Sequence, residues 1–426
     1  MTTVGILGGG QLARMLALAG APLGLRFLIM DTEADACAGQ CAPLLVGDYR
    51  DPAALAEFAS RVDVATFDFE NVPAESAQWL SERIPVFPNP GALAIAQDRL
   101  AEKSLFRELG IPVPAFADVD SRAALAMAVA AIGTPCILKT RRLGYDGKGQ
   151  FRIQPGTGSP TAETGCRSEQ RSWREGRAAG AARKSGAGHG GAAAAPAGDL
   201  AAAVDASWAS LGAQAGTVGL ILEAFVPFER ELSVVAVRGR NGEFRAWPLT
   251  ENWHVDGVLS ASLAPAGVDA ALAETAFTHA RALADRLDYV GVFALELFCR
   301  DGQLLANELA PRVHNSGHWS IEGAVTSQFE NHLRAVLGLP LGATDALGPA
   351  CMLNWIGALP AADPVLREPG GHWHDYGKLP RDGRKVGHAT LRAASAADLR
   401  AALLRVGDAL DRRAQLEPVI ARLAGD

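Results

Sequence analysis

The chain contains no run of basic residues, no bilayer-length apolar stretch and no paired-cysteine motif, and each absence removes a class of protein. A net charge of −7 with scattered Lys and Arg argues against a face that follows nucleic-acid phosphates. No apolar segment is long enough to span a membrane. The N-terminus enters a strand-like V-G-I-L directly, without the charged start and apolar core of a signal peptide. We therefore expect a cytoplasmic protein that binds neither nucleic acid nor membrane.

The cysteines are few and dispersed, and none forms a C-x-x-C zinc or redox pattern. Cys136 and Cys299 lie in apolar strand-like runs, so we expect buried thiols there. Cys37 and Cys41 are one helical turn apart, but two thiols alone do not make a metal site. Disulfides are not expected in a reducing compartment.

The length and the order of strand-like and helix-like runs predict three domains. Residues 1–112 alternate the two signals, which predicts a parallel sheet covered by helices. Residues 113–226 and 227–426 form the second and third domains. Between residues 156 and 198 the composition changes to Gly, Ala, Ser and Arg. So few large apolar side chains cannot offset the entropy of ordering, and we predict a disordered insertion.

Several elements of the first domain can be placed individually. Apolar runs predict strands at Val4–Leu7, Leu25–Met30 and Val62–Phe67. A helical pattern follows the first glycine-rich turn at Gln11–Ala19, and a longer helix is expected from Ala92 to Leu109, before an I-P-V-P segment ends the domain.

Two carboxylates in apolar surroundings give the strongest chemical signal. Glu296 and Glu308 lie in strand-like segments on either side of a D-G-Q turn. Because burying unpaired charges is costly, a cation is expected between them. Carboxylate oxygens suit Mg²⁺, which usually shares its shell with phosphate oxygens. The alternative, a buried Glu paired with a structural Arg, would be favoured for either residue alone. Arg312, His314 and Asn315 follow directly and suit an anion or a small polar substrate.

The register of this hairpin decides whether the two carboxylates share a face. Side chains alternate along a strand, so the turn must contain an odd number of residues. A three-residue loop at 301–303, with glycine in the left-handed position, pairs Glu296 with Glu308. A two-residue Asp-Gly turn would place Asn307 opposite Glu296. We predict the three-residue loop.

A second segment suits the phosphates of a nucleotide. Lys139 ends a strand and is followed by a glycine-rich loop at Gly144–Gln150, where the backbone can approach a ligand closely. The alternative is a flexible hairpin tip with solvated cations. Arg99 at the domain junction, with Lys103 one helical turn later on the same face, could reach a phosphate. A strand exit at Glu223–Val226 could contact adenine, although any strand exit could look the same.

Two further clusters are weaker. Gly8–Ala13 followed by Asp31 imitates the dinucleotide fingerprint, which is common and does not by itself indicate NAD. Near the C-terminus, Lys378, Arg384 and Lys385 lie within eight residues on a glycine-rich turn and suit a monophosphate. A solvated basic loop is an equally good interpretation of that segment.

Taken together, G-G-G-Q-L-A-R-M, G-Y-D-G-K-G-Q, N-E-L-A-P-R-V-H-N-S-G-H and G-R-K-V-G-H resemble the N5-carboxyaminoimidazole ribonucleotide synthetase family over nearly the whole chain. The resemblance implies a three-domain ATP-grasp fold of mixed α/β and α+β type, with an N-terminal parallel-sheet domain and ATP held between the second and third domains. It implies a homodimer that uses ATP, Mg²⁺, bicarbonate and 5-aminoimidazole ribonucleotide in purine biosynthesis, with carboxyphosphate as the intermediate. The loop at Gly144–Gln150 would close over it, and the insertion at 156–198 departs from the family pattern near that loop.

The resemblance also assigns roles to individual positions. The ATP contacts would be Arg99, Lys139, Gly144, Tyr145, Asp146, Gly147, Lys148, Gly149, Gln150, Glu223, Ala224, Phe225, Val226, Glu231, His254, Asn307 and Glu308. The metal ligands would be Glu296 and Glu308. The bicarbonate and aminoimidazole site would be lined by Tyr145, Asp146, Arg312, His314 and Asn315, and Asp146 or His314 would accept a proton. The ribonucleotide would contact Gln11, Glu70, Lys378 and Arg384.

Other functions remain as alternatives. A formate-dependent ribonucleotide transformylase or a biotin-type carboxylase would share the ATP-grasp fold, but the last two motifs disfavour both, and no biotinyl-lysine signal such as A-M-K-M is present. An NAD-dependent dehydrogenase would use Gly8–Ala13 and Asp31. A binding protein without catalytic activity is conceivable because of the insertion.

Overall fold

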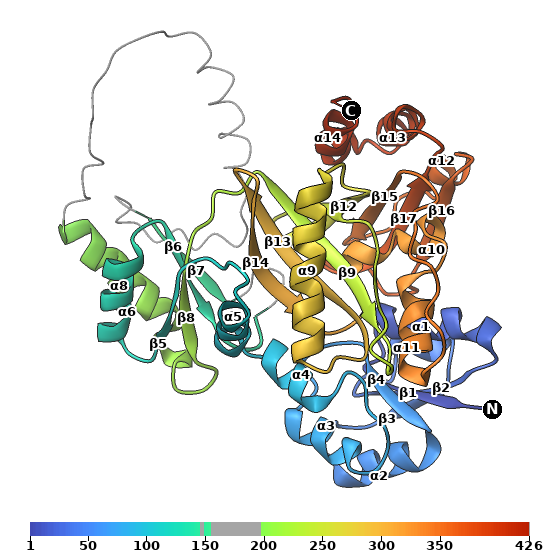
Figure 1. Ribbon diagram of the computed structural model, residues 1–426, viewed down its shortest axis with the longest axis horizontal. Helices are drawn as coiled ribbons and strands as arrows, with labels where there is room; N and C mark the ends of the chain where they lie inside the picture. Colours follow the sequence, from blue (N-terminus) through green and yellow to red (C-terminus); the bar gives the residue numbers. More distant parts are fainter. Residues whose placement is uncertain (145–148, 155–196, 426) are drawn as a thin grey trace. The chain divides into compact units, whose positions relative to one another are not determined.

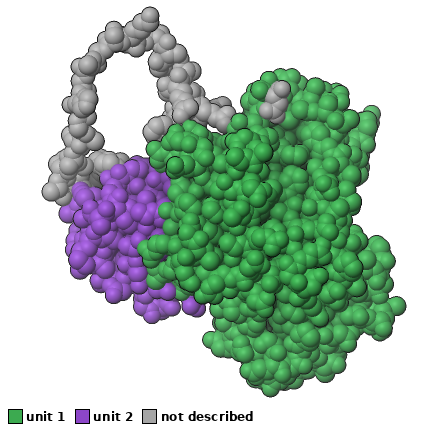
Figure 2. All heavy atoms as spheres, viewed as in Figure 1, with its two compact units in different colours: residues 1–113, 227–253, 259–426 green, residues 114–226, 254–258 purple. Residues whose placement is uncertain are grey.

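The computed structural model describes residues 1–144, 149–154 and 197–425, whose strands form three sheets (Figure 1). The chain groups into two compact units, coloured separately in Figure 2. Unit 1 comprises Met1–Val113, Pro227–Trp253 and Leu259–Asp426, and unit 2 comprises Pro114–Val226 and His254–Val258. Residues 145–148 of the glycine-rich loop lie outside the described residues, as does the predicted insertion apart from its last two residues, which belong to a helix. No helix in the described part of the chain is long and apolar enough to cross a bilayer.

The N-terminal part of unit 1 is a parallel sheet in the order β3-β2-β1-β4, which confirms the predicted architecture. Its short strands are almost entirely apolar because both faces are covered. The strands are β1 Thr3–Leu7, β2 Arg26–Asp31, β3 Leu44–Val46 and β4 Val64–Phe67. The helical segments are α1 Gln11–Gly20, η1 Ala21–Leu23, η2 Cys37–Gln40, α2 Pro52–Arg61 and α3 Ala74–Ser81.

The long helix predicted from Ala92 to Leu109 is wrong, because the structure has two helices there. They are α4 Pro90–Ala96 and α5 Arg99–Glu108. Asp98 is the N-cap of α5, and its carboxylate accepts a hydrogen bond from the Leu100 amide at 3.0 Å. Gln97 turns away and donates to the carbonyls of Glu70 and Val72. The break matters because it makes Arg99 the first residue of α5.

Unit 2 contains a sheet in the order β5-β8-β6-β7 with helices packed against it. The strand predicted at Cys136–Thr140 is confirmed, and Cys136 is buried as expected. The strands are β5 Phe116–Val119, β6 Cys136–Thr140, β7 Gln150–Ile153 and β8 Leu220–Ala224. The helical segments are α6 Arg122–Ile132, α8 Ala197–Leu211 and η3 Gly212–Gln214.

The largest sheet has the order β14-β13-β9-β11-β12-β15-β17-β16, with β10 paired to β9. Two of its strands, at Arg230–Arg238 and Gly291–Arg300, consist mainly of apolar residues with a few polar ones. The strands are β9 Arg230–Arg238, β10 Phe244–Ala246, β11 Thr250–Val255, β12 Val258–Ala264, β13 Gly291–Arg300, β14 Gln303–Ala310, β15 Ala350–Ile356, β16 Gly371–Asp375 and β17 Lys385–Arg392. The helical segments are α9 Ala270–Arg286, η4 Asn315–Gly317, α10 Ser320–Gly323, α11 Gln328–Leu337, α12 Asp363–Leu366, α13 Ala396–Ala409 and α14 Arg413–Arg422.

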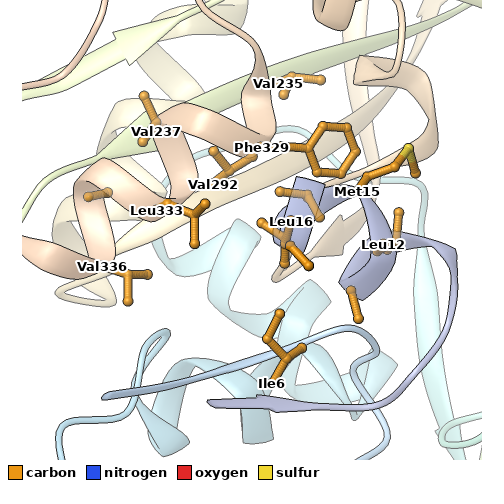
Figure 3. Packing of buried hydrophobic residues seen from close by; sticks show 14 of the residues in the cluster. Ile6, Leu12, Met15, Leu16, Val235, Val237, Val292, Phe329, Leu333 and Val336 are labelled. Carbon is orange, nitrogen blue, oxygen red and sulfur yellow. The ribbon is translucent and has the colours of Figure 1, made fainter. Parts of the chain in front are cut away.

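One apolar core joins the N-terminal sheet to the large sheet within unit 1. Figure 3 shows Met15 and Leu16 of α1 beside Phe329 and Leu333 of α11, all of them buried. The same cluster includes Val292 of β13, so α11 is packed between α1 and the large sheet. This core fixes the first residue of α1 relative to the carboxylate-bearing hairpin.

Candidate active site

Glu296 and Glu308 are opposite each other on β13 and β14, as predicted, but the loop between the strands is not the predicted one. Arg300 pairs with Gln303, so the turn is the two-residue Asp-Gly turn at 301–302, with φ values of 50° and 73°. Both central residues are left-handed, as the tightest hairpin turn requires. Glu296 and Glu308 are nevertheless paired, because a β-bulge at Asn307 inserts one extra residue before Glu308.

Polar side chains form a strip across one face of the large sheet. Glu296 is opposite Ser233 on β9, and cross-strand partners share a face. Glu231 is two residues before Ser233 and therefore lies on the same face, opposite Asn252 of β11. Asn252 donates to the Ser233 hydroxyl at 2.6 Å, which fixes the strip. Glu308, Glu296 and Glu231 thus lie on one face of the large sheet.

Three side chains that can donate hydrogen bonds lie against the two carboxylates. Arg99 donates to Oε2 of Glu308 at 3.2 Å, and Asn307 donates to Oε2 of Glu296 at 3.4 Å. The Nε2 atom of His314 lies 3.4 Å from Oε1 of Glu296. No group of three or more His, Cys, Asp and Glu among the described residues could form an all-protein metal cage. Two carboxylates on one face are the donor set expected for Mg²⁺ that also binds phosphates and water.

A buried ion pair lies beside this face. The Nε atom of Arg312 donates to Oε2 of Glu70 at 2.5 Å. Burial disfavours both charges, but the pairing outweighs it, so the pKa of Glu70 is lowered and the pKa of Arg312 is raised. Both groups therefore remain charged at neutral pH. The pair joins a loop after β4 to the loop after β14, two of the segments from which site residues were predicted.

The loop after β14 is held by residues that the sequence analysis did not identify. Gln328 accepts from the His314 amide at 2.8 Å and donates to the His314 carbonyl at 2.6 Å. The Nδ1 atom of His314 accepts from the Ser316 amide at 3.3 Å, so neutral His314 carries its proton on Nε2, facing Glu296. Asn315 is buried, and its amide exchanges two hydrogen bonds with the amide of Asn354. Nothing in the spacing of Gln328 or Asn354 indicated these contacts.

In unit 2, the side chain of Lys139 on β6 contacts Glu223 on β8. Its Nζ atom lies 2.9 Å from Oε2 of Glu223, and both side chains are largely buried. The two residues are diagonal neighbours because Ile137 of β6 is the partner of Glu223 on β8. The Phe225 amide donates to the Pro135 carbonyl at 3.1 Å, which anchors the strand exit. His254 belongs to the same compact unit.

The residues predicted for the ribonucleotide phosphate line a surface cavity of about 480 Å³ in unit 1. Lys378, Arg384 and Gln40 of η2 are among its lining residues. Lys378 donates to the side chain of Gln11, the first residue of α1. Burial lowers the pKa of Lys378, while the nearby Cys37 and Asp68 act in the opposite direction.

The glycine turn before α1 is not available for a pyrophosphate. Asp68, which the sequence analysis missed, accepts from the amides of Gly10 at 2.7 Å and Ala13 at 2.8 Å. Its carboxylate thus occupies the N-terminus of α1, where a bound phosphate would lie. Asp31 accepts from the Gly9 amide at 2.5 Å and from the Glu33 amide at 2.9 Å. Asp31, at the position of a ribose-binding acid, is therefore hydrogen-bonded to backbone amides of this chain. This disfavours a dinucleotide site.

Comparison with protein families covers most of the chain. The model of the ribonucleotide synthetase preATP-grasp domain matches residues 1–97, and that of the ATP-grasp domain matches residues 104–173 and 182–329. The model of the phosphoribosylaminoimidazole carboxylase C-terminal domain matches residues 350–402. The fold predicted from the sequence, ATP-grasp with an N-terminal preATP-grasp domain, is confirmed.

Several relatives with high coverage are described as N5-carboxyaminoimidazole ribonucleotide synthases. An N5-carboxyaminoimidazole ribonucleotide synthase of Pseudomonas aeruginosa is 49% identical over 405 residues, which cover 95% of this chain and 98% of the relative. One from Brucella melitensis is 43% identical, with 91% of this chain and 96% of the relative covered. The crystal structure of the Thermus thermophilus synthetase has a TM-score of 0.80 at 46% identity, with 95% of this chain and 98% of that one covered. An Aspergillus clavatus synthase in complex with ADP and 5-aminoimidazole ribonucleotide has a TM-score of 0.77 at 27% identity, with coverages of 96% and 99%.

Proposed function

Because the chain belongs to the N5-carboxyaminoimidazole ribonucleotide synthase family, we propose that it carboxylates 5-aminoimidazole ribonucleotide with bicarbonate, using ATP. The products are N5-carboxyaminoimidazole ribonucleotide, ADP and phosphate. The observation that carries this proposal is the pairing of Glu296 with Glu308 on the polar face of the large sheet. An ATP-dependent ligase needs a place where phosphate charge is neutralised, and this pair supports one.

Glu296 and Glu308 are the proposed ligands of Mg²⁺, which when bound would neutralise the charge of the transferring phosphoryl group. Arg99 is hydrogen-bonded to Glu308, and this supports its role near the same phosphates. The remaining proposed ATP contacts in unit 1 are Glu231 and Asn307, and those in unit 2 are Lys139, His254, the loop at Gly144–Gln150 and the strand exit at Glu223–Val226. Their support is the resemblance of these segments to the family, together with the Lys139–Glu223 contact.

The bicarbonate and aminoimidazole site is proposed around Arg312 and His314, with Tyr145, Asp146 and Asn315. Arg312 stays charged beside Glu70 and suits an anion such as bicarbonate or its phosphorylated form. Because carboxyphosphate decomposes in water, its carboxyl group must reach the substrate amine without release to solvent.

The substrate amine loses a proton when it is carboxylated, and Asp146 or His314 is proposed to accept it. The hydrogen bond from the Ser316 amide leaves neutral His314 with its proton on Nε2, where it can donate to Glu296. In this tautomer His314 is a poor acceptor at Nε2. This favours Asp146. An Asp146→Asn variant should then lose turnover, while His314→Asn should retain more of it.

The ribonucleotide phosphate is proposed to bind Lys378 and Arg384, with Gln11 and Glu70 on the side of the N-terminal sheet. The cavity beside Lys378 and the contact between Lys378 and Gln11 support this arrangement. A homodimer and a cytoplasmic location are proposed from the family resemblance. Light scattering on the purified chain would test the oligomeric state.

The decisive experiment measures ADP release with ATP and Mg²⁺ present, omitting bicarbonate or 5-aminoimidazole ribonucleotide in turn. We expect rapid ADP release and incorporation of labelled bicarbonate only in the complete mixture. ADP release that depends on neither component would refute the reaction. Release stimulated by formate in place of bicarbonate would indicate the transformylase alternative.

A further inference from the structure

The position of Glu308 depends on a local irregularity in β14. From Arg300–Gln303 to Leu297–Ala306 the ladder keeps the register set by the two-residue turn. At the next step Glu296 pairs with Glu308, and Asn307 is the extra residue of a bulge. A regular ladder would place Glu308 on the opposite face of the sheet, because side chains alternate. The two carboxylates can meet only while the bulge is maintained.

Helix α5 contacts the bulge at three consecutive residues. The Nζ atom of Lys103 donates to the carbonyl of Asn307 at 3.1 Å. Oε1 of Glu102 accepts from the Leu309 amide at 2.6 Å. Arg99, one turn earlier on the helix, donates to the Glu308 side chain at 3.2 Å. A bulge disrupts the ladder locally, and the Lys103 and Glu102 side chains bind backbone groups on either side of Glu308.

Both side chains that bind the bulge backbone carry ionisable groups and are enclosed, and burial raises the pKa of Glu102 to about 8. Lys103 is 0% exposed and Glu102 is 2% exposed. Burying ionisable groups contributes little to stability even when they are paired, and apolar residues of similar size often serve as well. Positioning of the bulge explains Glu102 and Lys103 better than a contribution to the stability of the fold does. Neither residue has a role in the proposed chemistry.

We propose that Glu102 and Lys103 are positioning residues that hold the Asn307 bulge and so keep Glu308 opposite Glu296. The proposal rests on the proposed function in one respect, since it takes the two glutamates as the metal ligands. Lys103 fixes the carbonyl before Glu308, and Glu102 fixes the amide after it. Together they limit how far the Glu308 carboxylate can turn or move from its partner strand.

The test uses four variants of the full chain. Lys103→Met keeps the length of the side chain and removes its donor, and Glu102→Leu removes the acceptor. Glu102→Gln keeps a carbonyl oxygen for the Leu309 amide and is the conservative control. Glu108→Leu is the matched control on α5, because the Glu108 side chain is 61% exposed. Far-UV circular dichroism and thermal unfolding show which variants fold.

Two readouts other than activity are measured on each folded variant. The first is the dissociation constant of Mn²⁺ in the presence of ADP, from the electron paramagnetic resonance signal of free Mn²⁺. Lys103→Met and Glu102→Leu should weaken binding about tenfold or more, the usual effect of losing a group that orients a metal ligand. Glu102→Gln and Glu108→Leu should stay within about threefold of wild type, because the orienting contact is kept.

The second readout is hydrogen exchange of the segment 303–310 without metal or nucleotide. Exchange should accelerate in Lys103→Met and Glu102→Leu and remain at the wild-type rate in both controls. Unchanged exchange and unchanged Mn²⁺ affinity in folded Lys103→Met would overturn the proposal. If Glu102→Gln and Glu102→Leu lost equal Mn²⁺ affinity, the role proposed for Glu102 would be wrong. If wild type itself bound no Mn²⁺, the metal assignment would fail, yet faster exchange in Lys103→Met would still support the contact with the bulge.

Discussion

Replacing His332, a buried residue of α11, should change how the stability of unit 1 depends on pH. Its Nδ1 atom accepts from the Val292 amide of β13 at 3.0 Å, and its Nε2 atom lies 2.8 Å from the Thr66 hydroxyl of β4. The neutral ring therefore carries its proton on Nε2, which donates a hydrogen bond to the Thr66 hydroxyl. Protonating Nδ1 would break the bond to Val292 and place a charge in the core.

Burial lowers the pKa of His332 from 6.5 to about 4. The unfolded chain binds this proton at a higher pH than the folded protein does. The contribution to stability is therefore fully present above pH 6.5 and is lost as the pH falls toward 4. Integrating the two titrations between pH 7.5 and pH 5 gives a loss of about 2 kcal/mol from this residue.

The assay is urea unfolding at these two pH values, followed by tryptophan fluorescence. Trp247, Trp319 and Trp355 are buried in unit 1 and report its unfolding. A His332→Asn variant lowers stability at both pH values, but the informative quantity is the difference between them. Wild type should lose about 2 kcal/mol more than the variant on going to the lower pH. Equal losses in the two proteins would refute the argument, because other buried histidines contribute alike to both.

Three further changes test the site and its surroundings. Glu308→Gln should abolish ADP release while leaving thermal unfolding unchanged, and wild-type turnover in this variant would contradict its role as a metal ligand. Lys378→Met should raise the KM for 5-aminoimidazole ribonucleotide about tenfold or more with a smaller effect on kcat, since the proposed charged hydrogen bond to the ribonucleotide phosphate would be lost, whereas exposed Arg381→Met should not. Because burial lowers the pKa of Lys378, that KM in wild type should begin to rise at a pH below the ordinary lysine range, and a flat profile there would contradict this. Asp68→Ala should lower the free energy of unfolding by about 1–2 kcal/mol, as the Gly10 and Ala13 amides lose their acceptor; an unchanged urea midpoint would contradict it.

Much of the fold could be predicted because its signals are local. The strands of the N-terminal sheet are short apolar runs, and their alternation with helices indicates parallel order. The break before Arg99 was missed because Gln97 and Asp98 look like ordinary helix residues in isolation. Only contacts with the segment at Glu70–Val72, distant in sequence, turn Gln97 out of the helix.

The pairing of Glu296 with Glu308 was predicted correctly, but the three-residue loop from which it was predicted is wrong. The Asp-Gly pair at 301–302 is a strong local signal for a two-residue turn, and the structure follows it. The bulge at Asn307 has no comparable signal, since its contacts come from a helix about 200 residues earlier in the chain. The roles of Gln328 and Asp68 were hidden for the same reason, because both bind backbone atoms of remote segments.

The most direct test of the account asks whether Glu296 and Glu308 hold one divalent cation. Mn²⁺ binding in the presence of ADP is measured for wild type, Glu296→Gln, Glu308→Gln and Glu274→Gln, a variant of an exposed residue on α9. We predict that either single change at the opposed pair weakens Mn²⁺ binding about tenfold or more, while Glu274→Gln binds as wild type does. Wild-type affinity in either Glu296→Gln or Glu308→Gln would contradict the shared site.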